Sequence, residues 1–188
     1  MSLIWIKVDR EKKTHSIYCD GIQLAGSTID TSDAQKILAF KNFYYSVLLG
    51  VTGEVHGANY IKKQLEIKLN NAEYIKLDDQ HINRNVTELI EKIAEDYKQK
   101  YNEYPDNSLI LSINGNLFKI NLIDTEINRW NCVKTNNDFI ACGAPYDIAT
   151  ALFYYDKDIK PQTLLDTVCK VTNTINNNLI SIENVEYK

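Results

Sequence analysis

The stretch HSIYCDGIQLAG, residues 15–26, ends a strand-like run on a carboxylate and a glycine, Asp20-Gly21, and a lysine follows at Lys36. A carboxylate and an ammonium that meet in a folded protein favour each other's charged forms and can tune a proton transfer beside them. Each residue also has a simpler interpretation, because Asp-Gly pairs commonly form turns and a single lysine is commonly solvated. The residue types therefore make Asp20 and Lys36 candidates for a site without defining one.

Thiols and imidazoles do not form a metal-binding motif. The four cysteines, at 19, 132, 142 and 169, include no CxxC pair, and of the three histidines only His15, four residues before Cys19, is near one of them in sequence. A zinc site is therefore not expected, and we interpret the cysteines as reduced, mostly buried thiols. Cys19 stands beside Asp20, but burial in a strand next to a carboxylate raises a thiol pKa and lowers its reactivity. We expect neither a metal nor another cofactor.

Composition excludes several classes of function. The chain has 188 residues, of which 44% are hydrophobic and 24% charged, which is typical of one globular domain with a substantial core. Its net charge is −4 and its basic residues form no stripe, so nucleic acid is not an expected partner. No stretch approaches the roughly 18 apolar residues of a membrane helix, and the start MSLIWIKVDR becomes charged too early for a signal peptide. We expect a cytoplasmic protein with no membrane partner.

The first half of the chain changes from strand to helix patterns. Residues 3–9 and 16–20, rich in β-branched and aromatic residues, flank the polar turn REKKTH and indicate a hairpin. A short segment at 34–40 leads to a second hairpin, whose long apolar strand is predicted over 43–51. Apolar residues at helical spacing then predict helices over 54–70 and 85–105. The second helix has Asn85 as its expected N-cap, Glu88 as the capping-box partner and Pro105 as its end.

The second half repeats this order of strands and helices. Strands are predicted over 107–123, with a type I′ turn at Asn114-Gly115, and over 127–134 and 138–143. Helices over 145–156 and 160–176 each have a proline in the first turn, and an extended segment begins at 179. Segregated helices and antiparallel hairpins indicate an α+β fold. Two antiparallel sheets stacked face to face, each covered by a helix pair, would bury every amphipathic helix face. We therefore predict a four-layer αββα sandwich in one domain over residues 1–188.

Two stretches carry a resemblance to a known family. One is FIACGAPYDIATALFYYD, 139–156, followed by KPQTLLDTVCKVTNTI, 160–175, and ISIENVEYK, 180–188. The other is YYSVLLGVTGEVHGANYIKKQLE, 44–66, with its strand, glycine turn and helix. In this order and at these separations they resemble proteasome β-subunits, above all the bacterial HslV-type peptidase and its phage-encoded relatives. The likeness extends over nearly the whole chain.

The enzymes of this family use an N-terminal nucleophile. After removal of the initiator methionine a Thr or Ser becomes the first residue, its hydroxyl attacks a peptide carbonyl, and its own α-amine accepts the proton. An α-amino pKa of about 7.7–8.0 suits a general base at neutral pH. Ser2 falls at the position of that nucleophile. Asp20 and Lys36 match the family's aspartate and lysine with one common offset, which a longer hairpin at REKKTH explains.

Two further positions match the family pattern. Gly53 corresponds to the turn whose backbone N–H points at the oxyanion, and Cys142 falls where the family commonly has a serine near the nucleophile's amine. The turn after Cys142 is one residue shorter here, and Ser2 lacks the methyl group that restrains a threonine rotamer. The resemblance thus implies a catalytic set of Ser2, Asp20, Lys36, Gly53 and Cys142. In this set Lys36 assists proton transfer and Asp20 orients the lysine and offsets its charge.

The resemblance also implies partners and an assembly. It implies a peptide or unfolded-protein substrate, a homo-oligomeric ring whose sites face a central chamber, and a ring ATPase partner. Two alternatives stay open. One is a structural or regulatory ring protein that keeps the fold without the chemistry. The other is an amidohydrolase for a non-peptide substrate, which a deep closed pocket in the monomer would favour.

Overall fold

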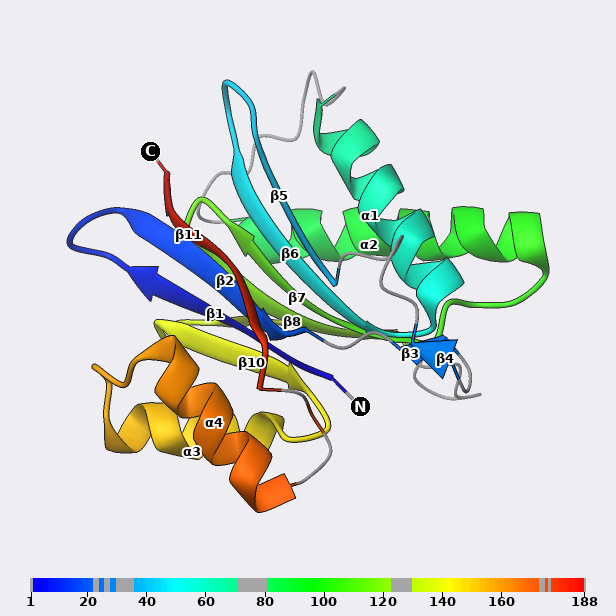
Figure 1. The fold of residues 1–188 in the computed structure, drawn as a ribbon. Coiled ribbons are helices and arrows are strands. Elements are labelled where there is room, and N and C mark those ends of the chain that lie inside the picture. The colour runs from blue at the N-terminus through cyan, green and yellow to red at the C-terminus, as the bar shows by residue number, and fades with distance from the viewer. Residues whose placement is uncertain are drawn as a thin grey trace.

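Two antiparallel sheets and two pairs of helices form the part of the chain that the computed structural model describes (Figure 1). The described residues are 2–21, 24–25, 28–29, 36–70, 81–122, 130–172, 175 and 177–187. The four-stranded sheet, in the order β10-β1-β2-β11, contains β1 (Leu3–Asp9), β2 (Thr14–Asp20), β10 (Phe139–Gly143) and β11 (Leu179–Glu186). The five-stranded sheet, in the order β5-β6-β7-β8-β9, contains β5 (Ile37–Lys41), β6 (Ser46–Gly53), β7 (Asn107–Ile113), β8 (Asn116–Leu122) and β9 (Trp130–Thr135).

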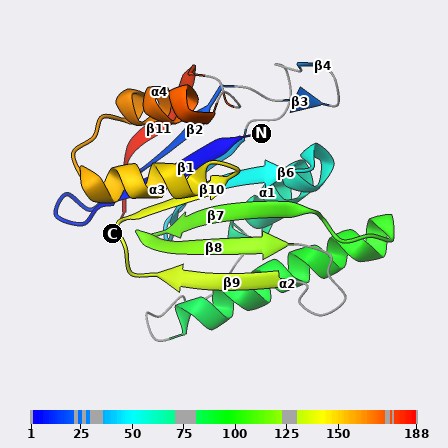
Figure 2. The same cartoon turned by 90° about the horizontal axis from the view of Figure 1, so that it is seen from below.

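Each sheet is covered by one pair of helices on its outer face. These are α1 (Val55–Asn70) and α2 (Ile82–Tyr101) on the five-stranded sheet, and α3 (Tyr146–Tyr155) and α4 (Pro161–Thr172) on the four-stranded sheet. Figure 2 shows the same arrangement from below, with the two sheets between the helix pairs. Two short strands, β3 (Leu24–Ala25) and β4 (Thr28–Ile29), pair only with each other among the described residues.

Three hydrophobic clusters separate the four layers. Period-two alternation along β1 sends Leu3 and Trp5 towards α3 and α4, whereas Ile4 and Ile6 point into the space between the sheets. The strands of the five-stranded sheet divide their side chains in the same way, with Leu48 in the inter-sheet cluster. Because both faces of each sheet are covered, the central strands β1, β6 and β7 have buried apolar side chains on both sides. The four-layer αββα sandwich predicted from the sequence is confirmed.

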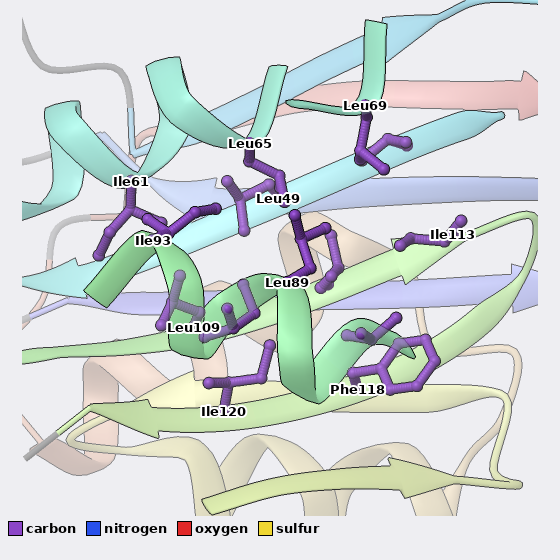
Figure 3. Close-up of a cluster of buried hydrophobic side chains, with 14 of the residues drawn as sticks. Leu49, Ile61, Leu65, Leu69, Leu89, Ile93, Leu109, Ile113, Phe118 and Ile120 are labelled. Carbon is purple, nitrogen blue, oxygen red and sulfur yellow. The ribbon is translucent and has the colours of Figure 1, made fainter. Parts of the chain in front are cut away.

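The helix faces follow the spacing read from the sequence. Ile61, Leu65 and Leu69 lie four residues apart on α1 and are buried. Figure 3 shows them on the same side as Leu89 and Ile93 of α2, facing the apolar side chains of β6, β7 and β8. Burying a large aliphatic side chain contributes roughly 1.5–3 kcal/mol, so this interface supplies a large share of the stability of that half of the fold.

The structure contains several of the turns and helix starts that the sequence predicts. Asn114 and Gly115 have φ values of 47° and 75°, as a type I′ turn requires, and they join β7 to β8. Helix α4 begins at Pro161, and Pro145 is the N-cap of α3. Of the predicted segments, residues 34, 35, 123, 127–129, 173, 174 and 176 lie outside the described part of the chain.

The predicted N-cap at Asn85 is wrong. Helix α2 begins at Ile82, and its N-cap is His81, four residues before Asn85, with no side-chain cap bond. The backbone N–H of Asn85 already donates to the carbonyl of His81, and Glu88 pairs with Arg84 at 2.7 Å. Burial of Ile82 one turn before Val86 extends the apolar face backwards and outweighs the capping pattern. At the other end the helix stops at Tyr101, before Pro105.

The strand predicted over 43–51 begins later, at Ser46. The side-chain oxygen of Asn42 accepts hydrogen bonds from the backbone N–H groups of Tyr44 and Tyr45, at 2.9 and 2.7 Å. These bonds fold residues 42–45 into the turn between β5 and β6, and Phe43 is left 75% exposed. The turn chemistry of asparagine thus overrides the strand propensity of three aromatic residues.

His15 of β2 is buried between the sheets among polar partners. Its Nδ1 lies 2.7 Å from Ser112 Oγ and its Nε2 lies 2.8 Å from Ser46 Oγ, and its ring meets Tyr187 edge to face. Burial, and to a smaller extent the positive charge of Lys41, lower the pKa of His15 from the ordinary 6.5 to about 4. The folded protein therefore keeps this imidazole neutral at pH values at which the unfolded chain protonates it.

We predict a loss of stability in mild acid that depends on His15. Between pH 7 and pH 5 the unfolded chain binds a proton at this position and the folded protein does not, so the free energy of unfolding falls by about 2 kcal/mol. Urea unfolding of His15→Asn across this range should lack that component. The matched variant His56→Asn, at an exposed position of α1, should keep it. Equal pH dependence in the two variants would contradict the prediction.

Candidate active site

Asp20 lies at the point where the start of β1 meets the end of β2. The antiparallel register places Ile4 opposite Cys19, so the first residues of the chain lie beside Asp20. The carboxylate is fully buried, and its Oδ1 accepts a hydrogen bond from the backbone N–H of Leu3 at 3.0 Å. The buried charge is therefore bonded to the residue that directly follows Ser2.

Lys36 approaches the same carboxylate from the segment that leads into β5. Its Nζ donates to Asp20 Oδ1 at 2.8 Å and to the Asp20 carbonyl oxygen at 3.0 Å. The side chain is only 10% exposed. The carbonyl oxygen of Lys36 accepts a hydrogen bond from Val51 N–H at 2.9 Å, which ties this segment to β6. The two residues that the sequence made candidates thus form a buried ion pair.

The second carboxylate oxygen of Asp20 is different. Oδ2 is buried and has no hydrogen-bond partner among the described residues. A buried carboxylate oxygen is ordinarily satisfied, so this atom has unused capacity to accept a hydrogen bond. It belongs to the same carboxylate that binds Leu3, next to the chain start.

Gly143 shapes the other side of the chain start. It pairs with Leu3 across β10 and β1, and its φ is 100°, a value that side chains rarely tolerate. A Cβ atom at this position would lie 1.8 Å from the carbonyl oxygen of Ser2. Glycine is therefore needed for the backbone of Ser2, which is half-buried, to lie against β10.

Gly53 ends β6 on the solvent-exposed side of this region. Its φ is 109°, and a Cβ atom would lie 2.4 Å from the carbonyl oxygen of Asp106. Backbone N–H groups alternate between the two edges of a strand. Because Val51 N–H donates to Lys36, the N–H of Gly53, two residues further on, faces the same edge of β6. The N–H of Gly53 and the buried Lys36–Asp20 pair therefore lie on the same side of β6.

Cys142 lies in the cluster between the sheets. Its register partner is Ile4, two residues along β1 from Ser2, and its side chain is buried beside Ile4 and Leu48. Burial raises the pKa of the Cys142 thiol to about 12, and a hydrogen bond with Thr52 opposes this rise in part. The thiol is neutral and a weak donor, so what it offers the neighbouring backbone is mainly packing.

The prediction that Cys19 is unreactive agrees with its environment. The pKa of its thiol is raised to about 12, mainly by burial; the charge of Lys36 opposes the rise and that of Asp20 adds to it. All four cysteines are free. Cys19 and Cys142 are buried, and Cys132 and Cys169 are half-buried.

Several residues around the site were missed by sequence reasoning. Gly143 stood next to Cys142 in the ACGAP motif, but the need for glycine there depends on contact with Ser2. Asn107 and Asn178 gave no signal, because both act through backbone groups of distant segments. The carbonyl of Asn178 accepts a hydrogen bond from Gly21 N–H at 2.6 Å, and the side-chain amide of Asn107 contacts the Gly53 turn.

Neither a metal-binding cluster nor a membrane-spanning helix is found in the part of the chain that the structure describes. In that part of the chain no group of three or more His, Cys, Asp or Glu side chains could hold a metal ion. Within the same residues, no helix has the length and apolar character needed to cross a membrane.

The fold is similar to solved structures of three kinds. HslV from Trypanosoma brucei has a TM-score of 0.66 at 15% identity, covering 97% of this chain and 98% of that one. BPH from Thiobacillus denitrificans, solved in complex with epoxomicin, has a TM-score of 0.63 at 10% identity and covers 100% of both chains. Anbu from Pseudomonas aeruginosa, solved as a helical assembly, has a TM-score of 0.59 at 10% identity, covering 97% and 80%. No protein-family profile matches the sequence, and no curated protein matches it.

These similarities define the class of fold. The described part of the chain has a proteasome-like N-terminal-nucleophile hydrolase fold, with two antiparallel sheets between two pairs of helices. At 15% identity or less the likeness is one of fold, and any chemistry has to be argued from the residues around Asp20.

We predict that the Lys36–Asp20 pair has a large stability effect when it is broken from one side. Lys36→Met leaves a buried carboxylate without its cation and should reduce the free energy of unfolding by about 3–5 kcal/mol. The double variant with Asp20→Asn should lose less than the sum of the two single losses, because the uncompensated charge is gone. Denaturant unfolding of the four proteins measures this coupling.

A matched control uses the Lys68–Asp96 pair, which has the same 2.8 Å separation but side chains 21% and 36% exposed. Lys68→Met should cost less than about 1 kcal/mol, since solvent already screens that pair. Similar losses for Lys36→Met and Lys68→Met would show that the burial of the first pair has no energetic consequence.

Proposed function

We propose that this protein is a proteasome-like peptidase subunit that uses Ser2 as an N-terminal nucleophile. The observation that carries the proposal is the buried Lys36–Asp20 pair, whose carboxylate also holds the N–H of Leu3. Forming an ion pair that is almost completely buried is costly, and a function for it beside the start of β1 would account for that cost. An amine and a hydroxyl on the adjacent first residue would supply that use.

The proposed mechanism begins after removal of Met1, which frees the amine of Ser2. The amine accepts the proton of Ser2 Oγ as the oxygen bonds to the substrate carbonyl carbon. The same proton then passes to the leaving amine as the peptide bond breaks. A water molecule attacks the resulting ester, again with the α-amine as base, and releases Ser2. Each step conserves atoms and protons and needs no other reactant.

Electrostatics favour the amine as a base in this position. The ordinary α-amino pKa of about 7.7–8.0 leaves most of the group protonated at pH 7. The nearby ammonium of Lys36 disfavours a second positive charge and would lower that pKa. Asp20 holds Lys36 in place, and the backbone N–H of Gly53 would donate to the oxyanion of the tetrahedral intermediate.

Assembly is part of the proposal. We propose a homo-oligomeric ring that encloses the sites in a chamber and receives peptides or unfolded chains, with a ring ATPase as a partner. The solved helical assembly of Anbu supports self-association of this fold. Large apolar side chains that stay exposed on the described surface provide candidate contacts: Phe43, Tyr44, Tyr155 and Val171.

We predict that peptide hydrolysis requires Ser2 as the first residue. The chain is produced from its own start, loss of Met1 is verified by intact mass, and cleavage of a fluorogenic peptide panel is followed. Ser2→Ala should lower kcat/KM at least about a thousandfold, because both the nucleophile and its proton transfer are lost. Ser2→Thr should remain active, since it keeps the hydroxyl and the amine.

The matched control is Ser181→Ala, which removes an exposed serine hydroxyl that bonds only Glu183 in the described contacts. It should leave activity within about twofold. Activity that survives Ser2→Ala would contradict the mechanism. A Met-free chain without peptidase activity would favour the inactive ring protein. Ser2-dependent cleavage of non-peptide amides alone would favour the amidohydrolase.

A further inference from the structure

Asn107 begins β7 and lies between the Gly53 turn and the first turn of α1. We infer that it is a positioning residue that fixes the direction of the Gly53 N–H. The inference rests on the proposed function, in which that N–H donates to the oxyanion. Asn107 touches neither substrate nor nucleophile in this account and acts only through the backbone around Gly53.

Asn107 forms hydrogen bonds with the residues on both sides of Gly53. Its side chain is buried, and Nδ2 donates to the carbonyl oxygen of Thr52 at 3.1 Å and to that of Glu54 at 2.9 Å. Two carbonyl acceptors fix which end of the amide is nitrogen, because an amide oxygen could not bond either one. The residues before and after Gly53 are therefore held by one side chain.

Because the peptide unit between Thr52 and Gly53 is planar, these bonds also fix the direction of the Gly53 N–H. The described chain contains no cis peptide bond, so the C=O of Thr52 and the N–H of Gly53 point in opposite directions within one plane. Asn107 draws the Thr52 carbonyl towards β7. The N–H of Gly53 must then point away from β7, towards the edge of β6 on which Val51 bonds Lys36. This is the side on which the proposed nucleophile lies.

A glycine turn needs such a restraint. Gly53 has a positive φ that suits glycine, and glycine has more conformational freedom than any other residue. On the β7 side, Glu54 N–H bonds the carbonyl of Asp106 at 3.1 Å, which holds the turn at one point. The two bonds from Asn107 restrain the carbonyls of Thr52 and Glu54 and thereby pre-align the N–H of Gly53.

The remaining atom of the amide gives a second, independent indication. Asn107 Oδ1 is buried and has no hydrogen-bond partner within the described residues. A Cβ atom at Gly57, in the first turn of α1, would lie 2.3 Å from it. An unsatisfied buried oxygen costs free energy, so the favourable hydrogen bonds of this amide are the two that its nitrogen makes. Gly57 is also the residue whose size makes room for it.

The test compares three variants of the Met-free protein with a fluorogenic peptide. Asn107→Asp keeps the shape but replaces the donor with an acceptor facing two carbonyls. Gly57→Ala keeps the Asn107 side chain but displaces its amide by steric contact with the new Cβ atom. The same change raises the helix propensity of α1. We expect both to lower kcat by about tenfold to a hundredfold with KM within about twofold, because the loss falls on the transition state. Asn114→Asp, at the other end of β7, removes a similar bond to the Tyr44 carbonyl and should leave kcat within about twofold.

Two readouts separate positioning from general damage. Titration of competent sites with an irreversible inhibitor gives kcat per active site. In addition, a peptide aldehyde, which forms a tetrahedral adduct with the serine hydroxyl, should bind more weakly by the same factor as kcat/KM falls. Normal kcat per titrated site in both Asn107→Asp and Gly57→Ala would overturn the inference while leaving the proposed function intact. A Met-free wild-type chain with no activity and no titratable site would overturn the proposed function, and the inference with it.

Discussion

The buried pair of Lys36 and Asp20 is the constraint on which the site depends. Neither charge reaches bulk solvent to any large extent, so each relies on the other and on backbone groups around it. The carboxylate takes a hydrogen bond from Leu3, and the ammonium also bonds the Asp20 carbonyl. Three separate segments of the chain must therefore meet at one point for the fold to be stable, and that point lies beside Ser2.

The two stacked sheets bring these three segments of the chain together. β2 and β10 flank β1 in one sheet, so the end of β2 and the end of β10 both lie next to the chain start. The other sheet contributes Gly53 at the end of β6 and Lys36, which directly precedes β5 and accepts a hydrogen bond from Val51 N–H of β6. Two glycines, Gly53 and Gly143, permit backbone approaches that a Cβ atom would block. The inter-sheet cluster fixes the separation of these parts, because close-packed side chains leave little freedom to shift.

The four layers and part of the candidate site could be predicted from the sequence, for identifiable physical reasons. Strand and helix periodicity, with the Asn114-Gly115 turn, was sufficient for the αββα order, because the hydrophobic pattern of each element reports which faces are covered. The resemblance added the pairing of Asp20 with Lys36, which no local pattern contains. The cap at Asn85 failed because burial of Ile82 outweighed a local motif. The positioning role of Asn107 could not be predicted from the sequence, because it depends on the register between β6 and β7.

The central claim is that the hydroxyl and the amine of Ser2 act together beside the buried pair, and a peptide epoxyketone tests it most directly. The hydroxyl would add to the ketone carbon and the amine would open the epoxide, so no atom is lost. The account predicts that the peptide beginning at Ser2 gains the whole mass of the inhibitor once Met1 has been removed. A folded, Met-free chain that gains no such mass, or that is modified only at a cysteine, would contradict it.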